Sequence, residues 1–139
     1  MKLKELTEYI FDTYSVEPDH PFKMDDVSCV YRHIGNRKWF ALTMNIPYRT
    51  LGIHREGNVD ILNIKCDPLV IGSLRGKPGF CPAYHMNKDK WITILLDGSA
   101  AREDIVFLLA MSYDLTNSLF NRSCRMRASN AAAASIRED

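Results

Sequence analysis

Two adjacent segments of alternating side chains constrain the fold of this chain more than any other feature. In residues 28–34 and in residues 38–46, successive side chains fall alternately into two sets that would face opposite sides of a sheet. This is the pattern of half-buried β-strands. Between them, Gly35-Asn36 supplies residues that tolerate a positive φ, so a tight two-residue hairpin turn is predicted. Pro47 ends the second strand because it has no N–H to donate. The chain must therefore build an antiparallel sheet.

Helices and a third strand surround this hairpin in the sequence. Apolar residues at helical spacing predict an amphipathic helix over 3–14, and a further strand is predicted over 59–66. Asp67-Pro68 then starts a short helix, because Asp accepts orphan N–H groups and Pro is preset for the first helical position. That helix is predicted to end near Arg75.

The second half of the chain adds a loop, a strand and a helix. Residues 78–90 are predicted to be an extended loop and 91–96 a central strand, while 48–54 fit either a helical turn or a short strand. Ser99 is predicted to cap a long last helix. The inward stripe of that helix consists of Ile105, Leu108, Leu109, Ser112, Leu115 and Leu119. Together these elements predict an α+β fold with an antiparallel sheet and helices packed on one face.

Length and composition are those of a small globular protein. The chain has 139 residues, of which 46% are hydrophobic, and we expect one domain over 1–120 and a flexible C-terminal tail over 121–139. It shows neither a signal peptide nor an apolar run of about 20 residues, so a cytoplasmic location is expected. The four cysteines lack paired spacing and are interpreted as reduced thiols, with no metal and no cofactor.

The charge is balanced overall but uneven along the chain. Eighteen Lys and Arg against seventeen Asp and Glu give a net charge of +1, which argues against a generic polyanion binder. However, residues 31–38 contain three basic side chains and no acid, and residues 75–90 contain four basic side chains against Asp89 alone. If these stretches share a face, the protein has a basic patch on a neutral body.

The segment 82–91, PAYHMNKDKW, is the predicted functional surface. Its phenol, imidazole, amide and ammonium groups offer donors, an acceptor and a titratable ring. In a ligand site, Asn87 and Lys88 would bind an anion, His85 would tune it by protonation, and Tyr84 or Trp91 would stack. The alternative is structural: both aromatic residues belong to the core, and Asn87 satisfies a turn.

Nothing in the sequence indicates a reaction, so the chain is not expected to be an enzyme. The polar cluster has no obvious carboxylate partner for acid–base work, and Cys81 is only a sequence neighbour of His85. None of the standard nucleotide, hydrolase or metal motifs occurs. His20, His33 and His54 are isolated and are interpreted as surface or internally satisfied residues.

Several blocks of this sequence resemble the MmcQ/YjbR family in their order along the chain, from about Val27 to Thr116. The blocks are Asn63–Pro68, Gly72–Arg75, PGFCPAYHMNKDKWITILLDG and Met111–Thr116. Lys90 stands where many members have a histidine, so a role for that histidine does not carry over. The resemblance implies a CyaY-like fold and a DNA-binding role through a double-wing surface of the sheet, a function inferred from fold analogy. It implies neither catalysis nor an iron site. The matching motif positions are Lys65, Asp67, Arg75, Tyr84, His85, Asn87, Lys88, Trp91, Ser112 and Tyr113.

Two functional hypotheses follow. In the first, the protein binds DNA, with basic residues on phosphates and aromatic residues on exposed bases. In the second, it binds a small anionic ligand in a pocket built from His85, Asn87 and Lys88, and a concave surface beside the loop would favour this alternative. A protein partner is a third possibility. Across the two leading hypotheses the candidate binding residues are Arg32, Lys38, Lys65, Arg75, Tyr84, His85, Asn87, Lys88, Lys90 and Trp91, and Lys77 is a further phosphate contact in the first.

Overall fold

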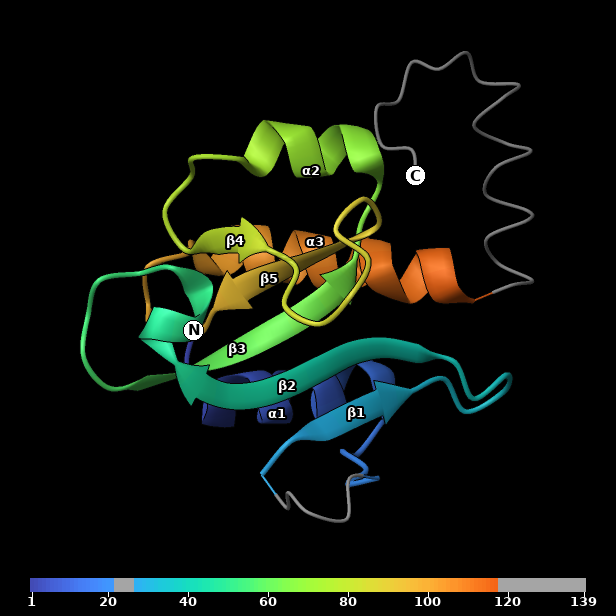
Figure 1. Ribbon diagram of the computed structural model, residues 1–139. Coiled ribbons are helices and arrows are strands. Elements are labelled where there is room, and N and C mark those ends of the chain that lie inside the picture. Colours follow the sequence, from blue (N-terminus) through green and yellow to red (C-terminus); the bar gives the residue numbers. More distant parts are fainter. Residues whose placement is uncertain (22–26, 118–139) are drawn as a thin grey trace.

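The computed structural model describes residues 1–21 and 27–117, and this part of the chain forms a five-stranded antiparallel sheet with order β1-β2-β3-β5-β4 (Figure 1). The long helices α1 and α3 cover one face of the sheet, and α2 lies beyond the β4 edge. The strands are β1 (Cys29–Arg32), β2 (Trp39–Pro47), β3 (Asn58–Lys65), β4 (Phe80–Pro82) and β5 (Trp91–Leu95), and the helices are α1 (Leu3–Tyr14), α2 (Pro68–Leu74), α3 (Arg102–Thr116) and a 3-10 turn, η1 (Tyr48–Leu51). The α+β prediction is confirmed.

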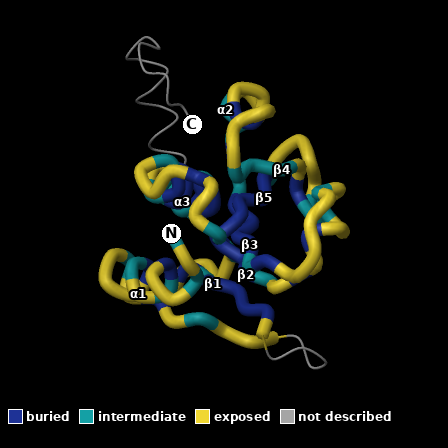
Figure 2. The backbone as a smooth tube through the Cα atoms, turned by 90° about the vertical axis from the view of Figure 1, so that its left-hand side faces the viewer, coloured by how far each residue is buried: buried dark blue, intermediate teal, exposed yellow. Residues whose placement is uncertain are grey.

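The alternation in β3 sorts its side chains between two environments. Leu62 and Ile64 join the main core beneath α1 and α3, whereas Val59 and Ile61 join a smaller cluster on the opposite face, as predicted. The helices contribute fully buried side chains such as Leu109 to the main core. Figure 2 shows this buried layer between α1 and α3 on one side and exposed loops on the other. We refer to the two sides as the helix-covered face and the open face.

The hairpin between β1 and β2 differs from the prediction. The connection is not a two-residue turn at Gly35-Asn36. Instead, the Arg37 N–H donates to the His33 carbonyl at 3.1 Å, and the left-handed residue is Arg37, with a φ of 64°. The turn is longer than predicted, since the His33 N–H donates to the Lys38 carbonyl at 2.9 Å, and the centre of the buried His33 ring lies 5.2 Å from that of Phe40. Since Gly35 shows no positive φ, its expected role was wrong.

A bulge at the start of β2 places a hydroxyl inside the sheet. Tyr31 pairs with Ala41 but Arg32 pairs with Trp39, so Phe40 is the extra residue. At this point the Ser112 hydroxyl, from α3, accepts from the Lys65 N–H at 2.9 Å and donates to the Phe40 carbonyl at 2.6 Å. One buried side chain thus bridges β2 and β3 where the regular ladder is interrupted.

The predicted loop 78–90 contains a strand that the sequence did not reveal. β4 pairs with β5 through Phe80, Cys81 and Pro82, at the edge of the sheet. Three residues with a proline carry too little periodicity to be recognised as a strand. Gly79 makes the close approach possible: its φ is 87°, and an added Cβ would lie 2.6 Å from the backbone nitrogen of Ala100.

The start of α3 also corrects the prediction. Its N-cap residue is Ala101, without a side-chain cap, and the Ser99 hydroxyl instead donates to Asp97 at 2.6 Å in the preceding turn. The predicted inward stripe is buried at Ile105, Leu108, Leu109 and Ser112, and Leu115 is half-buried. Leu119 and the predicted tail 121–139 lie outside the described residues.

Candidate functional site

A buried polar pair holds the 83–90 loop on the open face. The Tyr84 N–H donates to the Thr93 hydroxyl at 2.9 Å, and the Asn63 amide donates to the Tyr84 carbonyl at 3.1 Å. The Thr93 hydroxyl in turn donates to Asn63 Oδ1. Asn63 and Thr93 are fully buried on neighbouring strands. The hydrogen bond between Asn63 and Thr93 gives these buried polar groups partners, and their bonds to Tyr84 fix the loop to the centre of the sheet.

The loop held by Asn63 and Thr93 carries the side chains of Tyr84 and His85. The two rings lie 4.0 Å apart, with Tyr84 half-buried against the open-face cluster and His85 exposed. His85 adopts a left-handed φ of 58°, a conformation that non-glycine residues rarely adopt. The backbone therefore turns at His85 and directs the rest of the loop along the sheet surface.

Asn87 shapes the end of the same loop. Its Oδ1 accepts from the Asp89 N–H at 2.8 Å, and its carbonyl accepts from the Trp91 N–H at 2.9 Å. The Lys90 carbonyl accepts from the Cys66 N–H at 2.8 Å and ties the loop to the end of β3. These contacts match the structural interpretation of Asn87.

Both tryptophans of the chain lie at one end of the open face. Lys65 pairs in register with Trp91, and Arg32 pairs with Trp39. These side chains point away from α1 and α3, since their neighbours Ile64, Ile92, Tyr31 and Phe40 belong to the main core. The Arg32 guanidinium lies 5.7 Å from the centre of the Trp39 ring, within cation–π range. Arg32, Trp39, Lys65 and Trp91 form what we call the tryptophan end of the sheet.

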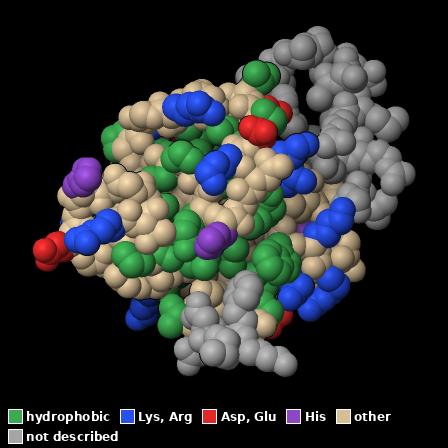
Figure 3. Space-filling view, viewed as in Figure 1, with side chains coloured by type: hydrophobic (Ala, Val, Ile, Leu, Met, Phe, Trp, Pro, Cys, Tyr) green, Lys and Arg blue, Asp and Glu red, His purple; other side chains and the backbone are tan. Residues whose placement is uncertain are grey.

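Exposed lysines flank the tryptophan end. Lys38 precedes Trp39 and Lys90 precedes Trp91, and both lysines are exposed. Figure 3 shows that on this face Lys and Arg side chains outnumber Asp and Glu and surround a hydrophobic surface. Arg32 is partly neutralised by Asp19, 3.1 Å away. Lys38 of the first basic stretch and Lys90 of the second therefore lie at the same end of the open face.

Not every basic residue of these stretches belongs to that surface. Lys77 lies near the opposite end of β5, where it forms an ion pair with Asp104 at 3.3 Å. Its expected contribution to a common basic patch is contradicted by this position. Lys77 was selected on charge alone, and sequence spacing does not show that the chain reverses direction between Lys77 and Lys88.

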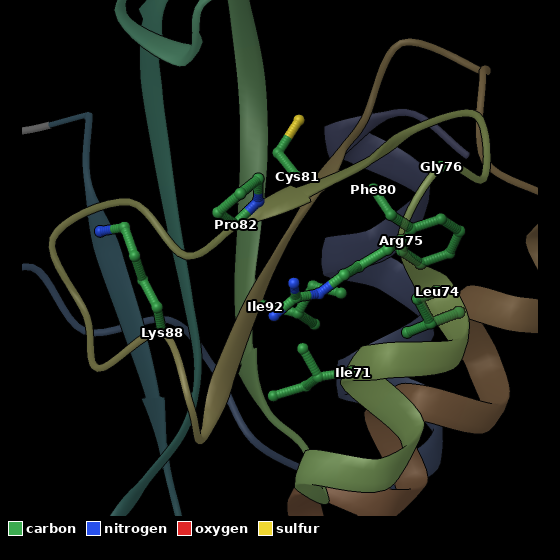
Figure 4. A pocket seen from close by; sticks show the side chains of 9 residues that line it. All are labelled: Ile71, Leu74, Arg75, Gly76, Phe80, Cys81, Pro82, Lys88 and Ile92. Carbon is green, nitrogen blue, oxygen red and sulfur yellow. The ribbon is translucent and has the colours of Figure 1, made fainter.

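Arg75 and Lys88 both line a separate cleft of about 400 Å³ between α2 and the β4–β5 edge. Figure 4 shows the Arg75 side chain extending from the end of α2 toward Ile92, with Lys88 on the opposite side in the loop. His85 and Asn87, which the ligand hypothesis grouped with Lys88, are not among the residues that line it. The apolar walls consist of Ile71, Leu74, Phe80, Pro82 and Ile92.

The remaining motif positions lie away from the open face. The Asp67 carboxylate accepts from the Leu69 N–H at 2.8 Å and caps α2, as predicted. Ser112 bridges β2 and β3, and Tyr113 stacks on Tyr14 with ring centres 4.3 Å apart. The ring nitrogen of His33 lies 2.7 Å from the Thr116 hydroxyl, and burial lowers the pKa of this histidine. These residues hold the fold together.

The cysteines among the described residues are free, with Cys29 and Cys66 buried and Cys81 half-buried. Burial raises the pKa of the Cys66 thiol to about 12 and raises that of Cys81, so both stay protonated at neutral pH. Residues 1–21 and 27–117 contain no group of three His, Cys, Asp or Glu side chains suited to a metal ion. No helix in that part of the chain is long and apolar enough to cross a membrane.

Three residues that build the candidate site were missed by sequence reasoning. Asn63 and Thr93, which support the loop, are polar residues inside otherwise apolar strands, and that interruption was an available signal. Trp39 follows a lysine just as Trp91 does, but only the second Lys-Trp pair was recognised as part of a candidate surface.

Comparison with known proteins agrees with the fold. The family model YjbR matches residues 11–115. This chain belongs to the YjbR family. It is 34% identical over 113 residues to the uncharacterized protein YyaQ of Bacillus subtilis, covering 81% of this chain and 96% of YyaQ.

Solved structures of family relatives show the same architecture. A crystal structure of a Pseudomonas syringae protein superposes with a TM-score of 0.82 at 42% identity, covering 84% of this chain and all of that chain. The Deinococcus radiodurans protein DR2400 gives a TM-score of 0.60 at 27% identity, covering 82% of this chain and 77% of that one. The family and the fold are thus established together.

Proposed function

We propose that this protein binds nucleic acid, and DNA in particular, through the tryptophan end of the sheet. The observation that carries the proposal is the pairing of cationic and indole side chains there: Arg32 with Trp39, and Lys65 with Trp91. Cationic groups bind phosphates, and half-exposed indoles offer faces on which unpaired bases stack. This combination favours single-stranded or locally opened DNA over an intact duplex.

The flanking loops add cations on both sides. The tip of the β1–β2 hairpin and the 83–90 loop lie at the same end of the sheet (Figure 1). They present Lys38 and Lys90, which form no ion pair within the described residues. A strand passing between these two projections would meet cations on either side and indoles beneath it, in the manner of a double-wing surface.

The modest net charge sets the strength that is expected. With a formal charge of +1, the molecule has no long-range field to attract a polyanion, so binding rests on a few local phosphate contacts. Affinity should therefore be weak at physiological salt and should decrease as salt increases.

The test uses the two tryptophans as built-in reporters, because both lie in the proposed interface. Single-stranded DNA titrated at low salt should quench their fluorescence, and duplex DNA of the same sequence should quench it less. Fluorescence anisotropy of a labelled strand should give a linear dependence of log affinity on log salt concentration. Lys38→Ala with Lys90→Ala should reduce that slope by about 1 to 2.

Lys4→Ala is the matched control, because Lys4 is exposed on α1, which covers the other face. It should leave the salt slope unchanged. Absence of binding to either form of DNA at low salt would overturn the proposal. So would an equal effect of Lys4→Ala and the double substitution.

A further inference from the structure

The cleft between α2 and the β4–β5 edge is distinct from the tryptophan end of the sheet. Its apolar walls come from both elements: Ile71 and Leu74 from α2, and Phe80 and Ile92 from the sheet. We propose that this cleft binds a small amphipathic organic anion, whose acidic group pairs with Arg75 and whose apolar body lies between these walls. The proposal does not depend on nucleic-acid binding.

The walls are preformed. Ile71, Leu74 and Ile92 retain 7%, 6% and 3% of their exposure, so they belong to the main core and present only one side to the cleft. The Asp67 cap and Pro68 fix the start of α2, and the β4–β5 pairing fixes the other wall. Binding of a ligand would therefore require little ordering of the side chains that form the site.

Size limits the class of ligand. A volume of about 400 Å³ falls in the range typical of small-molecule sites and is far below what a folded partner requires. The mainly apolar lining excludes a bare inorganic anion as the best occupant, because such an ion would leave the apolar walls without contact. An aliphatic or aromatic body is needed to fill it.

The charges of the residues that line the cleft determine which polar group the ligand must carry. The residues that line the cleft include two cations and no carboxylate. Arg75 and Lys88 form no ion pair with any other described residue. Arginine can donate two parallel hydrogen bonds to one carboxylate or phosphate. A single acidic group near Ile92 would pair with the Arg75 guanidinium, which extends to that point (Figure 4).

The test uses octanoate as the probe, with octanol as its neutral counterpart and acetate as its polar end alone. Octanoate should shift the backbone amide NMR signals of Ile71, Leu74 and Ile92. Octanol and acetate should each bind at least tenfold more weakly, because one lacks the charge and the other the apolar body. Equal binding of octanol and octanoate would overturn the anionic part of the proposal.

Substitutions separate this cleft from the surface charge in general. Arg75→Gln should weaken octanoate binding about tenfold or more, since it removes a charge-assisted hydrogen bond from an exposed residue that the fold does not need. Arg49→Gln, at an exposed arginine outside the cleft, should have no effect. Equal affinities of the two variants, or octanoate shifts scattered over the surface, would overturn the proposal.

A competition experiment distinguishes the cleft from the proposed DNA surface. Octanoate should not displace single-stranded DNA, and Arg75→Gln should leave tryptophan quenching by DNA unchanged. Displacement of octanoate from the α2–β4 cleft by the oligonucleotide would overturn the small-ligand assignment and extend the nucleic-acid interface to this site. Failure of DNA binding with intact octanoate binding would leave the cleft proposal standing.

Discussion

The two faces of the sheet bury their side chains to different extents. On the helix-covered face, α1 and α3 seal a large apolar core in which Tyr31, Phe40 and Leu109 are fully buried. On the open face, a small apolar cluster occupies one end and the buried Asn63–Thr93 pair holds a loop over the middle. The other end carries half-exposed tryptophans beside cations.

The polar side chains of the two faces therefore have different structural roles. Polar residues on the helix-covered face serve the fold: Ser112 bridges two strands, and His33 is buried against Phe40. On the open face, the polar pair Asn63–Thr93 supports an exposed loop instead. The YjbR motif positions thus divide into residues that hold the sheet together and residues whose side chains lie outside the core.

The largest expected effect tests the helix-covered face. Ser112→Ala removes the hydroxyl that accepts from the Lys65 N–H and donates to the buried Phe40 carbonyl, which should cost about 2–4 kcal/mol of the free energy of unfolding. Urea denaturation measures it. Ser73→Ala, at an exposed serine on α2, should stay within about 0.5 kcal/mol. If both substitutions cost equally little, Ser112 is not the bridge described.

The next largest expected effect concerns Thr93, on the open face. Thr93→Val removes the acceptor of the Tyr84 N–H and the donor to Asn63, and should cost about 1–2 kcal/mol. Amide hydrogen exchange should also accelerate in the 83–90 loop, because its anchor is lost. Thr93→Ser keeps the hydroxyl and should restore slow exchange.

The matched change on the other face is Thr43→Val. The Thr43 hydroxyl lies 3.0 Å from the Cys29 sulfur, which is a weak hydrogen-bonding partner, so this substitution should cost less than about 1 kcal/mol. It should leave hydrogen exchange in the 83–90 loop unchanged. Faster loop exchange in Thr43→Val would break the proposed division between the two faces.

The smallest effect concerns the pH dependence of stability. Burial lowers the pKa of His33, so between its folded pKa and about 6.5 the unfolded chain binds more protons than the folded protein. Stability should therefore rise with pH through that window, be fully present above pH 6.5, and be lost as the pH falls through the window. Urea denaturation at several pH values measures it, and the slope cannot exceed about 1.4 kcal/mol per pH unit for one proton.

Two substitutions test whether His33 causes this dependence of the free energy of unfolding on pH. His33→Gln should flatten it, because the titrating ring is gone. His54→Gln, at an exposed histidine, should leave it unchanged. An unchanged slope in His33→Gln would show that the pH dependence comes from other groups.

The sequence by itself determined the elements with strong local signals. The amphipathic pattern of 3–14, the alternation in β2 and β3, and the Asp67-Pro68 start of α2 are all properties of neighbouring residues, so they could be predicted without the fold. The polar composition of 82–91 singled out the loop, and the order of the predicted elements gave the α+β architecture. The resemblance to the family agreed with both, since its motifs are continuous segments too.

Only the tertiary structure decided which of those residues meet. The edge strand β4 forms because β5 supplies its partner, and the turn after β1 is set by where His33 packs. The Asn63–Thr93 support, the pairing of each tryptophan with a cation, and the cleft between Arg75 and Lys88 all join residues distant in sequence. Local propensity carries no information about such contacts, because they depend on strand register and on which face each side chain takes.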